Sequence, residues 1–105
     1  IDRVRAKVIM IRDEKMKRFA SHFLYLSSDN CFKQYVVELK DGCAYRIFPL
    51  TEEIESTIWL GGTIILSTSA SAIGNISVNT DGYVQSDIPV YAYLVTDGNT
   101  WKRLL

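Results

Sequence analysis

Apolar and polar residues alternate through the middle of the chain, which is the period-2 pattern of β-strands. Two runs rich in β-branched and aromatic residues, 32–40 and 43–48, are joined by Asp41-Gly42. Asp-Gly between alternating runs is a strong local signal for a tight β-hairpin. The proline at position 49 cannot donate a hydrogen bond to a sheet ladder. The pattern therefore predicts a hairpin that ends near Phe48.

A second hairpin is predicted from the stretch Gly74 to Gln85, GNISVNTDGYVQ. Ile76 and Val78 are expected to point inward, and the chain is expected to turn near Asp81-Gly82. A third Asp-Gly pair, at 97–98, predicts another turn. Further strands are predicted at 4–11, 63–70 and 88–95.

The segment 16–26, MKRFASHFLYL, fits two patterns. Its residues at helical spacing are Met16, Phe19, Ala20 and Phe23. Asp13 is a candidate N-cap for such a helix. As a strand, the segment places Phe19, Phe23 and Tyr25 on one face. Its aromatic content favours the strand, and the alternative of one short helix near residues 13–27 stays open.

Short β-rich runs separated by Asp-Gly and Gly-Gly turns predict a mainly β fold. We expect an antiparallel β-sandwich or a jelly-roll-like barrel. The 105 residues suit a single β domain, 1–105. The first residue is Ile1 and not a methionine, so we expect either the C-terminal part of a longer chain or a precursor with its start removed. No apolar run approaches the ~18 residues of a membrane span, and no membrane insertion is expected.

The two cysteines, Cys31 and Cys43, are predicted not to bond each other. A strand over 32–40 would span roughly 30 Å, whereas a disulfide requires Cα atoms about 6 Å apart. With a tight turn at Asp41-Gly42, Cys43 is expected opposite Lys40, far from Cys31. Free thiols suit a protein that folds in a reducing cytoplasm.

Charge is divided unevenly along a chain of zero formal net charge. Residues 1–50 carry ten Lys or Arg and six acids, a net +4, and residues 51–105 carry two basic residues and six acids, a net −4. A solvated surface, or attraction between copies in an oligomer, explains this division. The alternative is a basic nucleic-acid surface on the first half, with Arg3, Arg5 and Lys7 on one strand face. No aromatic residues lie between these cations, so nucleic acid is not the expected partner.

No motif in the sequence predicts catalysis or a cofactor. His22 is the only histidine, and the cysteines have no metal-ligand spacing, so no metal site is expected. Asp41, Asp81 and Asp97 each precede a glycine, where turn geometry accounts for them. We therefore expect a protein that is not an enzyme and needs no cofactor.

The two tryptophans, Trp59 and Trp101, have two interpretations. Each could close one end of the core, or each could form a platform on which a sugar ring stacks. Polar residues in predicted loops would then bind the hydroxyl groups of the sugar. The candidate ligand-binding residues are Trp59, Trp101, Asn79, Asp81, Tyr83 and Asn99.

The stretch from Phe48 to Val84 resembles the C-terminal head domains of bacteriophage tail fibres and baseplate receptor-binding proteins. The matching residues are Ile73, Gly74, Ile76, Val78, Asp81, Gly82 and Val84. The resemblance covers about a third of the chain. It implies a β-sandwich or jelly-roll head that forms a homotrimer and binds host surface saccharides in the virion tail after assembly in the bacterial cytoplasm. The charged residues 13–27 depart from the pattern of that family.

A second hypothesis is a small β-barrel interaction module of the OB or SH3-like type. Such a module would have a structural role, or it would bind nucleic acid through the basic first half of the chain. The receptor-binding head is the expected function, and this module is the alternative.

Overall fold

The computed structural model describes residues 16–51, 56–70, 73–96 and 100–104. The predicted strand at 4–11, the candidate cap Asp13 and the turn at 97–98 lie outside these residues. The described strands are β1 (Met16–Ser27), β2 (Asn30–Lys40), β3 (Cys43–Pro49), β4 (Thr57–Trp59), β5 (Thr63–Ser67), β6 (Ser77–Val78), β7 (Val84–Gln85), β8 (Tyr91–Thr96) and β9 (Thr100–Arg103). The protein is therefore mainly β.

The described part of the chain contains no helix, so the helical alternative for residues 16–27 was wrong. These residues form β1, which pairs with β2 along one edge and with β4 and β5 along the other. As a strand, this segment forms hydrogen-bond ladders on both edges and buries Phe19, Leu24 and Leu26. The free energy gained from these contacts outweighs the local preference for a helix that the spacing of its apolar residues indicated. None of the described segments is a helix long and apolar enough to cross a membrane.

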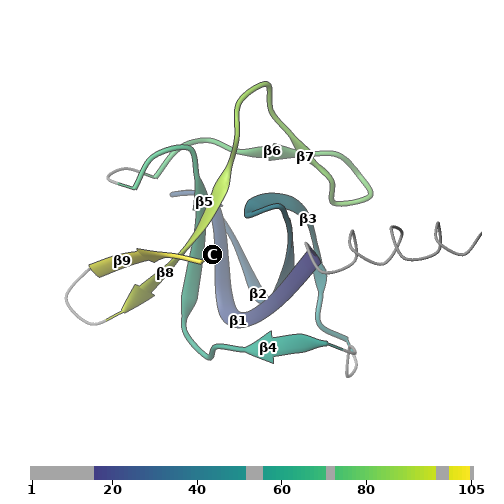
Figure 1. Cartoon of the computed structure of the whole chain (residues 1–105), viewed down its shortest axis with the longest axis vertical. Helices are drawn as coiled ribbons and strands as arrows, with labels where there is room; N and C mark the ends of the chain where they lie inside the picture. Colours follow the sequence, from purple (N-terminus) through teal and green to yellow (C-terminus); the bar gives the residue numbers. More distant parts are fainter. Residues whose placement is uncertain (1–15, 52–55, 71–72, 97–99, 105) are drawn as a thin grey trace, which may run out of the picture.

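Seven strands form one curled sheet in the order β3-β2-β1-β5-β8-β9, with β4 paired to β1 (Figure 1). The pairs β1–β4 and β1–β5 are parallel, so the sheet is mixed, whereas an antiparallel sandwich or jelly-roll-like barrel was expected from the sequence. The reason is that the chain returns to the beginning of β1 after β3 and then runs beside β1 in the same direction. The curl brings β3 close to the start of β8, where the N–H of Ala44 donates to the carbonyl of Val90 (2.7 Å). This single hydrogen bond does not make a ladder, and the described strands form no closed barrel.

The first predicted hairpin is confirmed. Lys40 pairs with Cys43, and Asp41 (φ 55°) and Gly42 (φ 85°) both adopt left-handed conformations. Two left-handed central residues are the requirement of a type I′ turn, which Asp-Gly supplies. Both cysteines are free, as predicted, with Cys31 far along the hairpin.

The second predicted hairpin is also confirmed, as a separate two-stranded sheet of β6 and β7. Val78 pairs with Val84, Ile76 is buried, and Val78 packs against the core. The N–H of Ile76 donates to the carbonyl of Leu26 (3.0 Å), which ties this hairpin to the end of β1. Figure 1 shows β6 and β7 lying across one end of the curled sheet, so the hairpin covers the core there.

The core consists mainly of aliphatic side chains from the main sheet and from the β6–β7 hairpin. Its fully buried members include Leu24 and Leu26 of β1, Leu39 of β2, and Ile64 and Leu66 of β5. Because alternate residues of a strand face opposite sides, the residues between these positions lie on the outer face of the sheet.

Candidate functional site

The rings of Phe32 and Tyr35 stack, with centroids 4.6 Å apart and planes inclined by 26°. Residues three apart in a regular strand point to opposite faces. Between them, Gln34 adopts a left-handed backbone conformation (φ 52°), and its carbonyl accepts a hydrogen bond from the N–H of Leu50 (2.9 Å). This local distortion of β2 places both rings on the same side of the strand.

The stacked rings form one wall of a pocket of about 280 Å³. The remaining walls come from the end of β3 and from the turn between β6 and β7. The lining residues of this aromatic pocket are Phe32, Tyr35, Ile47, Phe48, Pro49, Val78, Asn79, Thr80, Asp81 and Gly82. The volume is close to the lower end of the range for small-molecule sites. A pocket of this size suits one ring of a larger ligand.

Asn79 organises the turn that closes the pocket. Its side-chain Oδ1 accepts hydrogen bonds from the N–H groups of Asp81 (3.0 Å) and Tyr83 (2.9 Å). The N–H of Gly82 donates to the Asn79 carbonyl (3.0 Å), and Gly82 has φ 88°. A turn followed by a left-handed glycine is the usual three-residue hairpin loop. Three of the residues that carry the resemblance to phage head domains, Val78, Asp81 and Gly82, therefore line the pocket.

Gly82 also joins the turn to the main sheet. Its carbonyl accepts a hydrogen bond from the N–H of Ile47 in β3 (2.9 Å). A Cβ atom at position 82 would run into the carbonyl oxygen of Ile47. The close approach of the two backbones, and hence the shape of the pocket, depends on the absence of a side chain at this position.

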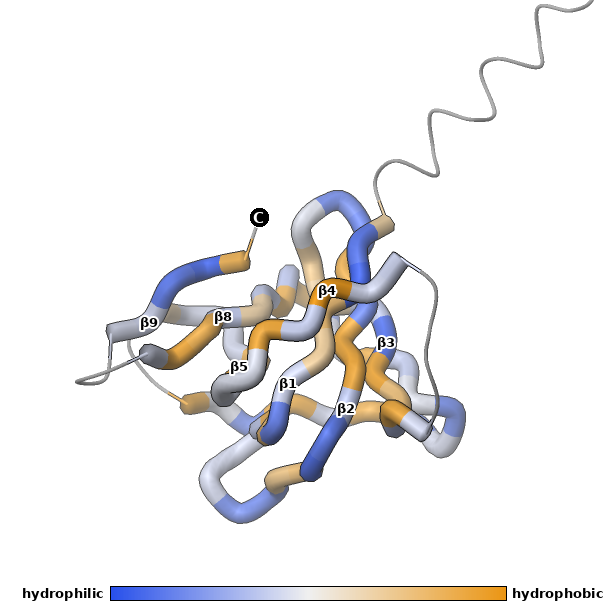
Figure 2. Tube along the Cα trace, turned by 90° about the horizontal axis from the view of Figure 1, so that it is seen from below, coloured by the Kyte–Doolittle hydropathy of each residue, from blue (hydrophilic) through white to orange (hydrophobic). Residues whose placement is uncertain are grey.

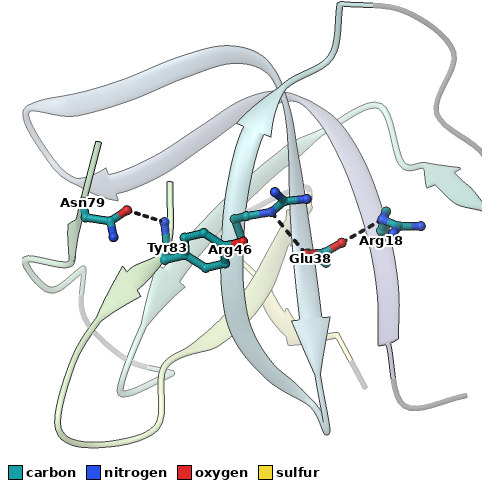
Figure 3. A network of polar contacts seen from close by, with 5 residues as sticks. All are labelled: Arg18, Glu38, Arg46, Asn79 and Tyr83. Atoms are coloured by element: carbon teal, nitrogen blue, oxygen red, sulfur yellow. Dashed lines mark hydrogen bonds and ion pairs between the residues drawn. The ribbon is translucent and has the colours of Figure 1, made fainter. Parts of the chain in front are cut away.

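A row of three charged residues crosses β1, β2 and β3 and ends beside the pocket. Arg18, Glu38 and Arg46 are directly paired across β1, β2 and β3 (Figure 3). Arg18 Nε donates to Glu38 Oε2 (2.9 Å), and Arg46 Nε lies 3.3 Å from Glu38 Oε1. The Glu38 side chain is only 4% exposed, so its charge is balanced almost entirely by the two arginines.

Arg46 connects this row to the pocket wall. Its guanidinium carbon lies 4.7 Å from the ring centre of Phe48, a lining residue, and 5.5 Å from that of Tyr83. The planar guanidinium group is attracted to both aromatic faces. Arg46 therefore fixes Phe48 and the end of the β6–β7 turn relative to each other.

The aromatic pocket combines apolar rings with polar groups. Phe32, Tyr35 and Phe48 supply aromatic rings, and Asn79 and Asp81 supply polar groups at the exposed rim. Asp81 is the one charged residue among the lining residues. No cluster of three potential metal ligands occurs within the part of the chain that the structure describes.

The structure brings together only some of the residues predicted from the sequence. Asn79 and Asp81 both line the pocket. Tyr83 lies beside it, where its ring contacts that of Tyr45 edge to face (5.3 Å). Asn99 lies outside the described residues.

Neither tryptophan lines the pocket. Trp59 is 48% exposed on β4, and its ring contacts the edge of His22 at 4.8 Å. Its neighbour Ile58 is 51% exposed, and Figure 2 shows hydrophobic positions along β4. Trp101 is half-buried on β9 and packs against Tyr93 (5.7 Å). The two tryptophans are therefore on different elements from the pocket residues.

Four lining residues were not among the candidates expected from the sequence: Phe32, Tyr35, Phe48 and Pro49. Strand periodicity places Phe32 and Tyr35 on opposite faces, and only the left-handed Gln34 reverses this arrangement. Phe48-Pro49 was interpreted as the end of a strand. That interpretation agrees with β3, but it gave no indication that the strand end faces the 79–82 turn.

Comparisons of the chain with protein-family models, curated proteins and solved structures give no match. The assignment of a function therefore rests on the geometry of the described residues.

Proposed function

We propose that this protein is a non-enzymatic domain that binds a saccharide in the aromatic pocket. The observation that carries the proposal is the stacked pair Phe32–Tyr35 opposite the polar turn residues Asn79 and Asp81. A sugar ring has apolar C–H faces, which pack on aromatic rings, and hydroxyl groups around its edge, which need hydrogen-bond partners. The pocket offers both kinds of surface within one volume.

The polar rim is suited to hydroxyl groups. The Asn79 Oδ1 atom is used within the turn, which fixes the orientation of the amide and leaves its Nδ2 group to donate toward a ligand. The Asp81 side chain is exposed and can accept hydrogen bonds from neighbouring hydroxyls. This fixed donor beside an acceptor gives the site selectivity among sugars.

The resemblance of residues 48–84 to phage receptor-binding heads extends the proposal to a biological role. In this role, the domain is a sandwich or jelly-roll head of a tail or adhesin-like assembly, forms a homotrimer and recognises a saccharide on the host surface. The covering of the main sheet by β6 and β7 supports the sandwich form. The alternative is an OB or SH3-like module, which the curled sheet in Figure 1 and the hydrogen bond from Ala44 of β3 to Val90 support.

A glycan array followed by calorimetric titration tests the proposal. We expect millimolar to micromolar binding of at least one glycan, and Phe32→Ala and Asp81→Asn should each weaken it about tenfold or more. Tyr45→Ala is the matched control, because Tyr45 is an exposed aromatic residue of β3 outside the pocket. Absence of binding across the array, or an equal loss in the control, would contradict the proposal. Sedimentation analysis tests the trimer separately.

A further inference from the structure

A second surface of interest lies on the outer face of the sheet, opposite the core. The ladder pairs place Lys33, Phe23, Thr63, Val95 and Trp101 in one row across five strands. Tyr25, Ile65, Tyr93 and Arg103 form the adjacent row. Directly paired residues share a face of a sheet. We call the surface formed by Phe23, Tyr25, Lys33, Tyr93, Trp101 and Arg103 the stacking face.

Aromatic rings occupy both sides of the stacking face. Phe23 is 40% exposed and Tyr25 is half-buried on β1. On the other side, Trp101 covers the buried ring of Tyr93. Between them, β5 contributes the shorter side chains Thr63 and Ile65. The exposed ring of Phe23 and the half-buried rings of Tyr25 and Trp101 lie on the two sides of these shorter side chains, and together they form a surface on which planar groups can stack.

The charges of the stacking face are positive. Lys33 on β2 and Arg103 on β9 are both exposed, one at each side of the sheet. The Arg103 guanidinium carbon lies 3.9 Å from the ring centre of Tyr91. Along the described positions of the two rows there is no Asp or Glu. The face is therefore complementary to an anionic ligand.

We propose that the stacking face binds single-stranded nucleic acid. Exposed bases would stack on Phe23, Tyr25 and Trp101, while Lys33 and Arg103 bind backbone phosphates. Aromatic rings flanked by cations are the combination that sequence-tolerant single-strand binding proteins use. A duplex keeps its bases stacked on each other, so it cannot use the aromatic rings.

Tyr25 remains uncharged beside a phosphate. Its hydrogen bond with Cys31, directly opposite on β2, raises the pKa of the phenol above its ordinary value. A tyrosine phenol is already neutral at physiological pH, and the raised pKa of Tyr25 keeps it so. This proposal uses different residues from the saccharide pocket and does not depend on it.

Fluorescence anisotropy with a labelled oligothymidylate of about 12 nucleotides tests the proposal. We expect binding at low salt that weakens roughly sevenfold when the salt concentration is raised fourfold, because two neutralised phosphates contribute a slope of about −1.4. Lys33→Gln should reduce this slope by about half. Phe23→Ala should weaken binding by about 5- to 100-fold, the effect of removing one base-stacking ring.

Two controls distinguish base stacking from simple charge attraction. Tyr45→Ala removes an exposed aromatic residue away from the stacking face and should leave binding unchanged. Inorganic polyphosphate at equal charge concentration should compete poorly, because it carries no bases. Absence of binding at low salt, equal competition by polyphosphate, or normal binding by the folded Phe23→Ala protein would each overturn the proposal. Phe23 and Lys33 are exposed, so their substitution should not prevent folding.

Discussion

Phe32 and Tyr35 stack at 4.6 Å although they are three residues apart in one strand. The left-handed Gln34 between them makes this contact possible. Because a β-branched residue is strongly disfavoured in that conformation, Gln34→Val should lower the free energy of unfolding by about 1–2 kcal/mol and weaken ligand binding in the aromatic pocket. Urea denaturation measures the first effect, and calorimetry measures the second.

The control for this prediction is Gln34→Gly. Glycine adopts the left-handed conformation without strain but increases the entropy of the unfolded chain, so stability should change by less than about 1 kcal/mol. Equal destabilisation by valine and glycine would show that the backbone conformation of residue 34 is not the cause.

Gly82→Ala should destabilise the protein by about 2 kcal/mol or more and abolish binding in the pocket. The new Cβ would meet the carbonyl oxygen of Ile47, in a backbone conformation that alanine rarely adopts. The matched control is Gly74→Ala, whose Cβ would find only Ser67 Oγ, at 3.8 Å. The control should change stability by less than about 1 kcal/mol. Similar unfolding curves for the two variants would contradict the close approach of Gly82 to β3.

Glu38→Ala should lower the free energy of unfolding by about 1–3 kcal/mol. The substitution removes the acceptor of a charge-assisted hydrogen bond and takes away the Glu38 carboxylate that lies between Arg18 and Arg46. Both arginines are about one third exposed, so solvent screening keeps the effect below that of a fully buried pair. Chemical denaturation measures the change.

Glu38→Gln is the comparison for this prediction. It retains an oxygen acceptor for Arg18 without the charge, and we expect a smaller loss than for alanine. A change of less than a few tenths of a kcal/mol for Glu38→Ala would show that the Arg–Glu–Arg row contributes little to the support of the pocket.

Trp59→Ala should change stability by less than about 1 kcal/mol and leave saccharide binding unchanged. Trp59 is 48% exposed, lies outside the pocket and contacts mainly the ring of His22. Removal of a buried aromatic residue would instead cost roughly 3–5 kcal/mol. Thermal unfolding and the glycan titration measure the two effects. Loss of glycan binding in the folded variant would return the ligand site to Trp59, the platform first considered from the sequence.

The sequence by itself determined the local features that follow from backbone preferences. Asp41-Gly42 set a type I′ turn, Asp81-Gly82 set the second hairpin, and the spacing of the cysteines excluded a disulfide between them. Asn79 and Asp81 were named as candidate site residues because polar turn residues are visible in the sequence, and both line the pocket.

The tertiary structure alone decided which distant segments meet. The parallel pairing of β1 with β4 and β5 depends on how the chain returns after β3, and no local pattern encodes that path. The aromatic pocket depends on one left-handed residue, Gln34, which breaks the period-2 rule on which strand prediction relies. The stacking face joins residues from β1, β2, β8 and β9, whose common orientation follows from sheet register. Register is set by burial of the core across the whole sheet, so it is a property of the folded chain and not of any single segment.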